Sequence, residues 1–346
     1  MPTAGFPNKQ ARAAGKMMKL RITKRRIVWS LVALIAIAAV AAVVVMGPFL
    51  LRVRHFAASP AGGYHADFYL YVSPKAKRIA RSGTQATLLV QPNNSGINSD
   101  DLEVHRRDAW WTCFGRHGLA DELGVVLLVP AFPRPATDWR IYTHALDRDV
   151  FTTAAATRPD LHRLDLQLMA MVDAARAALA AEGLAIDARI LIQGFSASGM
   201  FANRFAALHP SRVKAVAAGA PGGWPVAPVA EHAGEALPYP AGLADIEQLI
   251  GQPFDVESYR AMPQLIVMGA LDDNDSLEFT DGWDKPAAQQ VDRLFGADPM
   301  SRWEDARALY QTAGADARFV LVDGVGHDRR KLQHLTTEFF ARVMTR

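Results

Sequence analysis

The chain has 346 residues, half of them hydrophobic, which suffices for one large domain or two ordinary ones with a substantial core. Its net charge of +3 is unevenly distributed, because ten of the 38 Lys and Arg residues lie within residues 1–54, which contain no acidic residue. The other 28 basic residues are outnumbered by 35 acidic ones, so the body of the chain is mildly acidic. A nucleic-acid-binding protein, which needs a basic face on its folded domain, is disfavoured.

Residues 27–46 form an uncharged apolar run, IVWSLVALIAIAAVAAVVVM, which follows a basic arm over residues 1–26. At about 1.5 Å per residue, a helix over this run is roughly 30 Å long, the thickness of a bilayer core. The basic residues before it predict that the amino terminus stays in the cytoplasm. We therefore expect an uncleaved, single-pass signal anchor in the cytoplasmic (inner) membrane, with the lipid bilayer as a partner and the following domain on the extracytoplasmic side.

Two alternatives to an anchor remain open. A signal peptide cleaved near Ala57-Ala58-Ser59 would leave a secreted protein, although its apolar region is normally shorter, about 7–15 residues. A buried core helix is disfavoured, because such a helix rarely follows so basic an arm.

After a linker at residues 47–63, apolar runs alternate with helical patterns. Strands are expected at residues 64–72, 86–90, 125–129, 189–193, 213–218, 264–268 and 319–322. Helices are expected from Asp100 or Asp101 onward, and at residues 164–181, 199–208, 301–312 and 330–343. Residues 225–261 contain several prolines and suit an insertion or cap. The alternation predicts one α/β domain over residues 64–346, with a mostly parallel central sheet and helices on both faces.

The segment from Gly194 to Gly199 joins a β-branched strand to a helical pattern. A strand, a sharp turn and a helix would lift the Ser196 hydroxyl out of the backbone at the carboxyl edge of the sheet, as in a nucleophile elbow. The alternative role for Ser196 is to cap the following helix. Ser198 fits worse as the nucleophile, since the residues two before and two after it are Ser196 and Met200.

A nucleophilic serine needs a neighbouring base, and the base needs a third group to hold its tautomer. Asp272 and His327 each follow a predicted strand, and the carboxyl ends of parallel strands meet at one edge of a sheet. The chain order Ser, Asp, His is the order expected for an elbow serine in such a sheet. Asp273 and Asp275 remain alternatives for the acid, and a surface-loop role remains an alternative for His327. A calcium loop is disfavoured, because the acidic run lacks the glycine and distal glutamate of an EF-hand.

On these motifs, residues 64–346 resemble the α/β-hydrolase family, and within it esterases of the polyhydroxybutyrate-depolymerase and feruloyl-esterase type. The family pattern G-x-S-x-G would place a glycine at Ser198, whereas this chain has Gly199 one position later. The resemblance implies an α/β-hydrolase fold and a serine hydrolase that cleaves carboxylic esters. Ser196 would be the nucleophile, His327 the base and Asp272 the orienting acid.

The resemblance also implies an oxyanion hole, formed by the N–H of Ala197 and a second donor from the loop at residues 91–96. This loop lacks the His-Gly dipeptide of many relatives, so the backbone N–H of Asn93 or Asn94 is expected there, with an asparagine side chain as an alternative. Both asparagines also suit ordinary turn positions. Trp224 could wall a substrate pocket, and burial against residues 225–261 is an equal alternative.

No cofactor or metal is expected, because zinc-ligand spacing, a phosphate-binding glycine loop and a Rossmann fingerprint are all missing from the sequence. Cys113 is the only cysteine, so no intramolecular disulfide can form, and a small core residue is expected there. The expected substrate is a small or polymeric ester. A peptidase or thioesterase with the same triad, or a non-catalytic envelope protein with this fold, remains an alternative.

Overall fold

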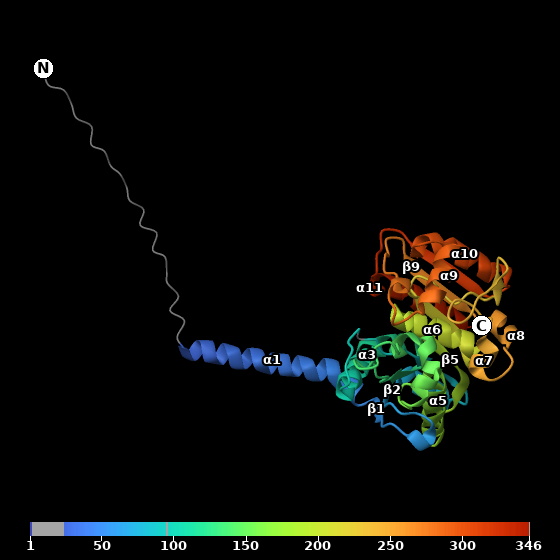
Figure 1. Cartoon of the computed structure of the whole chain (residues 1–346). Helices are drawn as coiled ribbons and strands as arrows, with labels where there is room; N and C mark the ends of the chain where they lie inside the picture. The colour runs from blue at the N-terminus through green and yellow to red at the C-terminus, as the bar shows by residue number, and fades with distance from the viewer. Residues whose placement is uncertain (2–23, 95, 346) are drawn as a thin grey trace. The chain divides into compact units, whose positions relative to one another are not determined.

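The structure, a computed structural model, describes Met1 and residues 24–94 and 96–345 (Figure 1). The chain divides into two compact units, Met1–Leu50 and Leu51–Arg346. The basic arm predicted at residues 1–26 lies largely outside the described residues.

Helix α1 (Lys24–Leu50) is the helix of the first unit and contains the apolar run. Several of its apolar side chains are exposed, among them Trp29, Ile35 and Val43. In the part of the chain that the structure describes, no helix combines the length and the apolar character needed to cross a bilayer. The membrane-spanning helix predicted at residues 27–46 is therefore not supported by the structure.

The second unit is built on an eight-stranded sheet in the order β1-β2-β4-β3-β5-β6-β9-β10. The strands are β1 (Val53–Phe56), β2 (Phe68–Val72), β3 (Ala86–Val90), β4 (Val126–Pro130), β5 (Ile186–Phe195), β6 (Val213–Gly219), β9 (Gln264–Gly269) and β10 (Ala317–Val322). Strand β2 pairs antiparallel with β1 and β4, and the pairs from β4 to β10 are parallel. The mostly parallel sheet predicted from the sequence is confirmed. Strand β1 falls within the expected linker at residues 47–63, so the domain begins before residue 64.

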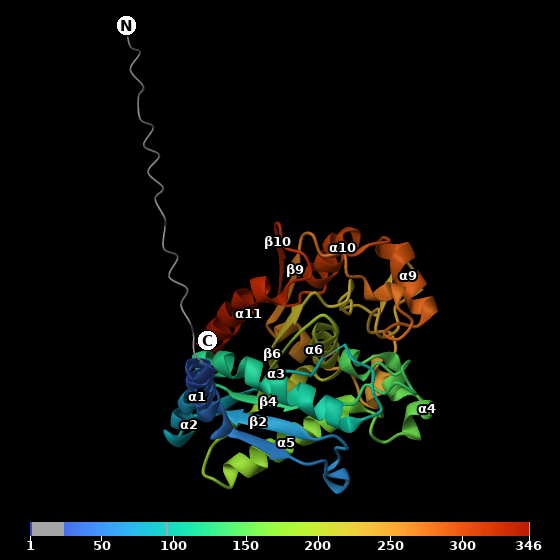
Figure 2. The same ribbon diagram turned by 90° about the vertical axis from the view of Figure 1, so that its left-hand side faces the viewer.

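Helices cover both faces of this sheet. Helix α3 (Leu102–Leu123) packs on β2 and β4, and α11 (Arg329–Met344) packs on β5, β6 and β9 beside α3. On the opposite face, α5 (Leu164–Ala180) packs on β4 and β5, and α6 (Ala197–Leu208) packs on β5 and β6. Figure 2 shows α3 crossing in front of β2 and β4. The remaining longer helices are α2 (Pro74–Arg81), α9 (Lys285–Phe295) and α10 (Pro299–Thr312).

The core lies between these layers. Strands β3, β4 and β9 are buried at every position, as parallel strands covered on both faces require. Cys113 is buried in α3, in agreement with the prediction, and burial raises the pKa of its thiol. Short helical turns occur at Pro60–Gly62, Thr143–Ala145, Arg148–Phe151, Thr153–Ala156 (α4), Pro210–Arg212 and Ser276–Glu278.

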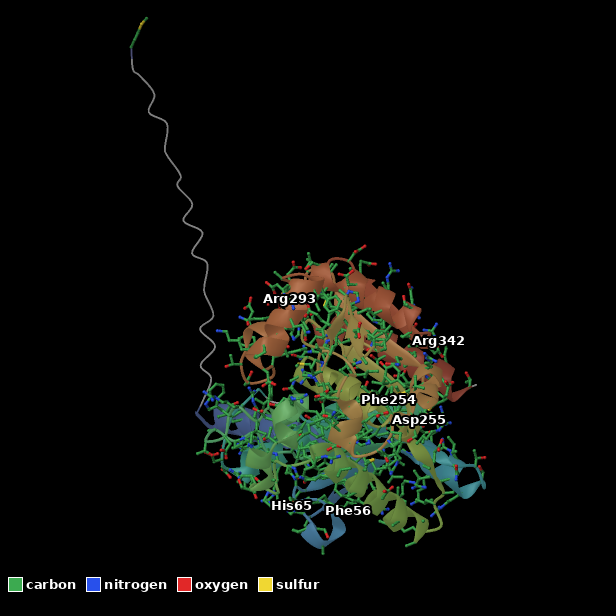
Figure 3. All side chains as sticks on the ribbon, turned by 45° about the vertical axis from the view of Figure 1, so that its right-hand side comes forward. Phe56, His65, Phe254, Asp255, Arg293 and Arg342 are labelled. Carbon is green, nitrogen blue, oxygen red and sulfur yellow. The ribbon has the colours of Figure 1, made fainter. Side chains whose placement is uncertain are left out.

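Residues 225–261 contain a two-stranded hairpin, β7 (Glu231–His232) and β8 (Glu235–Ala236), and two short helices, α7 (Ile246–Ile250) and α8 (Val256–Ala261). Asp255 caps α8 by accepting the Ser258 N–H at 3.0 Å (Figure 3). Arg293, on α9 in the same view, forms a 2.6 Å ion pair with Glu235. This segment is thus attached to α9 by a charge pair between exposed side chains.

Candidate active site

Ser196 lies at the turn between β5 and α6, with φ 59° and ψ −128°. A positive φ at a non-glycine residue is strained, and such strain is characteristic of a nucleophile elbow. The Ser196 N–H donates to the carbonyl oxygen of Gly219 at 2.9 Å, and the Ser196 carbonyl accepts the Met200 N–H at 2.9 Å. Its side chain makes no capping hydrogen bond with α6. The backbone therefore holds Ser196 from both sides, and the capping alternative is not what the structure shows.

Two glycines allow the strand, turn and helix to approach this closely. A Cβ atom at Gly194 would collide with the carbonyl oxygen of Ser198, and one at Gly199 would collide with that of Gly219. Both collisions are with backbone, which cannot move aside as a flexible side chain can. The position at which α6 needs a glycine against the sheet is therefore 199, one residue later than in the family pattern.

Ser198, which occupies the position of the family glycine, is buried and fully engaged. Its hydroxyl accepts the Phe195 N–H at 3.0 Å and donates to the Phe195 carbonyl oxygen at 2.9 Å. The side chain thus closes the turn from within. This arrangement explains how a serine is accommodated there, and it argues against Ser198 as the nucleophile.

Asp272 and His327 lie together after the neighbouring strands β9 and β10. His327 Nδ1 is 3.0 and 2.9 Å from the two carboxylate oxygens of Asp272. The carboxylate is 1% exposed, whereas the imidazole is 28% exposed. The Leu271 N–H donates to the Val325 carbonyl oxygen at 2.8 Å, which ties the two loops together. The structure therefore presents a buried acid that orients a partly accessible imidazole.

The other two candidate acids are placed differently. Asp275 is buried, accepts the Leu277 N–H at 3.0 Å and forms a 2.8 Å ion pair with Arg302. Asp273 is exposed. Across the described residues, no cluster of three or more His, Cys, Asp or Glu side chains could hold a metal ion. The acid beside His327 is Asp272.

His327 also approaches the elbow through the residue before Ser196. Its ring packs against the ring of Phe195, with centroids 4.6 Å apart. Within the described residues, the hydrogen bonds of the His327 ring are those to Asp272, and none joins it to the Ser196 hydroxyl. The structure thus brings Asp272 and His327 into contact, and it places His327 against the elbow rather than in hydrogen bond with Ser196.

Asn93 and Asn94 follow β3 and have different surroundings. Asn93 is fully buried; its amide donates to the Phe132 carbonyl oxygen at 3.0 Å and accepts the Phe132 N–H at 3.1 Å. Asn94 is half-buried and donates from Nδ2 to the Phe195 carbonyl oxygen at 3.4 Å. The Asn93 side chain is therefore committed to the neighbouring loop, whereas Asn94 lies against the elbow.

Ala197, the other expected donor, is the first residue of α6. The N–H groups of a first helical turn have no acceptor within their own helix. The Ala197 N–H is therefore one of the groups that α6 itself does not engage, and it directly follows Ser196 in the chain.

Trp224 is a core residue. It is 2% exposed, its indole N–H donates to the Ala241 carbonyl oxygen at 2.9 Å, and its ring stacks on Phe295 at 4.3 Å. The structure therefore shows burial against the 225–261 segment, and Trp224 does not line the cavity described below.

His144 was not singled out from the sequence, although it lies at the centre of the loop contacts near Asn93. Its Nε2 is 2.9 Å from the Phe132 carbonyl oxygen and 3.1 Å from Asn93 Nδ2. Complete burial lowers the pKa of His144 to about 3, so the ring is neutral at physiological pH. A short turn with no periodicity carries it, which left no signal in the sequence.

No protein-family model and no curated protein sequence matches the chain. Solved structures do match: poly(aspartic acid) hydrolase-1 from Sphingomonas sp. KT-1 is 18% identical over 83% of this chain and 97% of that chain, with a TM-score of 0.53. The chain adopts the α/β-hydrolase fold. A poly(3-hydroxybutyrate) depolymerase from Bordetella parapertussis is also similar, at 19% identity over 80% of this chain and 90% of that chain, with a TM-score of 0.47. The α/β-hydrolase fold predicted from the sequence is confirmed for the second unit, and Ser196 follows β5 near the centre of its sheet.

Proposed function

We propose that this protein is a serine hydrolase that cleaves carboxylic esters, with Ser196 as nucleophile, His327 as base and Asp272 as orienting acid. The observation that carries the proposal is the hydrogen-bonded pair of His327 and buried Asp272, packed against a strained serine turn. Strained backbone and an oriented imidazole at one sheet edge are what acyl transfer requires.

The geometry suggests how the proton moves. Asp272 accepts the Nδ1–H of His327, which leaves Nε2 unprotonated and able to accept a proton. In the proposed reaction, Nε2 takes the Ser196 hydroxyl proton while Oγ bonds to the ester carbonyl carbon. The same proton then passes to the departing alcohol oxygen as the ester C–O bond breaks. Water repeats the sequence on the acyl-enzyme and releases the carboxylic acid and free Ser196.

The tetrahedral oxyanion needs donors that are already in place. Ala197 directly follows Ser196 in the elbow, and Asn94 donates to the Phe195 carbonyl oxygen at 3.4 Å; we assign the oxyanion hole to the Ala197 N–H together with Asn94. Asn93 would act by holding this loop, since its side chain is bonded to Phe132. A missing Ser196–His327 hydrogen bond is compatible with catalysis, because such bonds often tighten only when substrate binds.

A fluorophosphonate probe tests the function directly, because it bonds only to an activated serine. We expect labelling of the wild-type chain and of the Ser198→Ala variant, and no labelling of Ser196→Ala. Hydrolysis of nitrophenyl esters of graded chain length should depend on Ser196 in the same way. Equal labelling of wild type and Ser196→Ala would refute the proposal.

The location of the enzyme is a separate proposal that rests on the sequence. The uncharged run at residues 27–46 and the eight basic residues before it support a cytoplasmic amino terminus and an extracytoplasmic hydrolase domain. A reporter fused after Arg346 provides the test. Alkaline phosphatase, which is active only outside the cytoplasm, should be active when fused there. If instead only a reporter that works in the cytoplasm is active at this position, the proposed orientation is wrong.

A further inference from the structure

A cavity of about 340 Å³ lies beside the elbow. Its walls come from the loop after β3, from α3, from the elbow itself and from the first residue of α11, and they include Gln91, Asn94, Arg116, Phe195, Ser198 and Arg329. The lining contains two arginines and no acidic side chain. Its volume is within the range of small-molecule sites.

Within the part of the chain that the structure describes, no ion pair joins either arginine to a carboxylate. Arg116 donates to Gln333 Oε1 at 2.5 Å, and that partner is an uncharged amide. The ion pairs of the described residues involve other arginines, for example Arg302 with Asp275, but not Arg116 or Arg329. Two arginine side chains, which stay charged at any physiological pH, therefore line one cavity that has no carboxylate among its described lining residues.

A buried polar group in the same wall also lacks a partner. Gln91 is 4% exposed, and its Nε2 donates to the Pro92 carbonyl oxygen at 3.0 Å. Its Oε1 has no hydrogen-bond partner among the described residues. Buried acceptors are normally satisfied, so this oxygen indicates space for a ligand that carries a donor, such as a hydroxyl or amide N–H.

The cavity is adjacent to the proposed nucleophile. Phe195 lines it, immediately precedes Ser196, and contacts the His327 ring at 4.6 Å. Asn94 lines it as well and donates to the Phe195 carbonyl oxygen at 3.4 Å. A substrate with its ester carbonyl at Ser196 can therefore extend a neighbouring group toward Arg116 and Arg329.

We propose that this cavity is a substrate subsite for a carboxylate group, so that the preferred substrates are esters carrying a carboxylate near the scissile bond. Arginine suits this role because its planar fork pairs with both carboxylate oxygens. The inference rests on the proposed ester hydrolase function and specifies its substrate class. The low exposure of Gln91 and the absence of a competing acid in the wall favour an anion with a nearby donor over an apolar group.

Matched ester pairs test the subsite. One pair is the nitrophenyl monoester of adipate and the corresponding nitrophenyl methyl diester, which differ only in the free carboxylate. In the second pair the free carboxylate lies on the leaving alcohol: 4-butyryloxybenzoate is compared with its methyl ester. In at least one pair we expect kcat/KM to favour the charged member by about tenfold, as charge-assisted hydrogen bonds would provide. The preference should fall as salt is added.

Variants then assign the preference to the cavity. The ratio of charged to neutral kcat/KM should fall to near one in the Arg116→Gln Arg329→Gln double variant and recover only in part with lysine at both positions, because lysine restores the charge but not the planar fork. Arg330→Gln is the matched control, because it removes the same charge from the next residue of α11, which is exposed as Arg329 is but does not line the cavity. No preference in wild type, or an undiminished preference in the double variant, overturns the subsite.

Binding to the Ser196→Ala variant, measured by calorimetry with the same esters, separates the two proposals. Tighter binding of the charged ester that depends on Arg116 and Arg329 supports the subsite. Ser196-dependent hydrolysis of neutral esters without any charge preference overturns the subsite alone. Hydrolysis of all esters by Ser196→Ala at the wild-type rate overturns the proposed function. In that case, the difference in binding between the charged and the neutral ester still tests the subsite.

Discussion

His327 Nδ1 lies 3.0 and 2.9 Å from the two carboxylate oxygens of Asp272, although the two residues are 55 positions apart in the chain. They meet because β9 and β10 are parallel neighbours in register, with Gly269 opposite Val322, so that the loops after both strands leave the same edge. The carboxylate fixes one imidazole tautomer and leaves the other nitrogen free. This contact is the main geometric support for the proposed chemistry.

Replacing the acid should remove most of the activity without removing the base. In Asp272→Asn, the amide can donate to Nδ1 and favour the wrong tautomer, so we expect kcat/KM for a nitrophenyl ester to fall roughly 10³- to 10⁴-fold. Asp273→Asn is the control, because Asp273 is exposed and next in sequence, and it should remain within about twofold of wild type. Equal losses in both variants would show that Asp272 has no special role.

Ser198→Ala should weaken the turn while leaving its chemistry in place. The substitution removes an acceptor for the Phe195 N–H and a donor to the Phe195 carbonyl. We expect the free energy of unfolding to fall by about 1–2 kcal/mol, measured by chemical denaturation, because one hydrogen-bonded group is lost in a buried setting. Fluorophosphonate labelling should persist, and its loss would mean that Ser198 takes part in the reaction.

Gly199→Ala should be strongly destabilising for a different reason. The added Cβ would collide with the Gly219 carbonyl oxygen and push α6 away from the sheet, which we expect to lower the free energy of unfolding by about 3 kcal/mol. Gly118→Ala in α3 is the matched control, because a Cβ there has nothing within 4 Å. The control should raise stability by up to about 1 kcal/mol through helix propensity. Similar effects at both positions would exclude the proposed close approach.

Asp165 should make stability depend on acid pH. Burial alone would raise the pKa of this carboxyl, but hydrogen bonds from His209 and Arg163 outweigh it and lower the pKa to about 2. Because the folded pKa lies below the unfolded value of about 3.9, the contribution is fully present above pH 4 and is lost as pH falls from about 4 toward 2. The shift corresponds to about 2–3 kcal/mol.

Denaturation at several pH values tests this linkage. Asp165→Asn should reduce stability at neutral pH and flatten its decline between about pH 4 and pH 2. Asp173→Asn, on the same helix but half-exposed in its pair with Arg212, should change stability by less than about 1 kcal/mol. An unchanged acid profile in Asp165→Asn would contradict the assignment of the pKa shift.

Asn93 and Asn94 should separate stability from catalysis. Asn93→Ala leaves the buried Phe132 N–H without its acceptor, whereas the Phe132 carbonyl oxygen keeps its contact with His144 Nε2, so we expect a loss of about 1–3 kcal/mol in the free energy of unfolding. Asn94→Ala should change stability by less than about 1 kcal/mol and lower kcat for ester hydrolysis. A larger stability loss at Asn94 than at Asn93 would reverse these roles.

Residue patterns along the chain predict much of the architecture. Apolar β-branched runs predicted seven of the strands within a few residues, because parallel strands buried on both faces must be continuously hydrophobic. Strand β1 was mistaken for linker, since it is a short edge strand with no fully buried position and shows no such run. Helix α9 is not among the helices predicted from the sequence, although its buried residues Ala288, Val291 and Phe295 follow a helical period. Local chemistry also marked Gly194, Ser196, Asp272 and His327 as candidates, because strand-to-loop transitions are visible along the chain.

The arrangement of those candidates depends on contacts between segments that are far apart in the chain. His327 contacts Asp272, whereas Asp275 pairs with Arg302. The Asn93 side chain donates to Phe132, and the Trp224 indole donates to Ala241. None of these contacts is visible in a local sequence pattern. Arg116 and Arg329 belong to α3 and α11, and nothing in either local pattern indicates that they share a cavity. The two arginines come together because α3 and α11 pack side by side on the sheet. The proposed substrate specificity therefore depends on helix packing and not on a sequence motif.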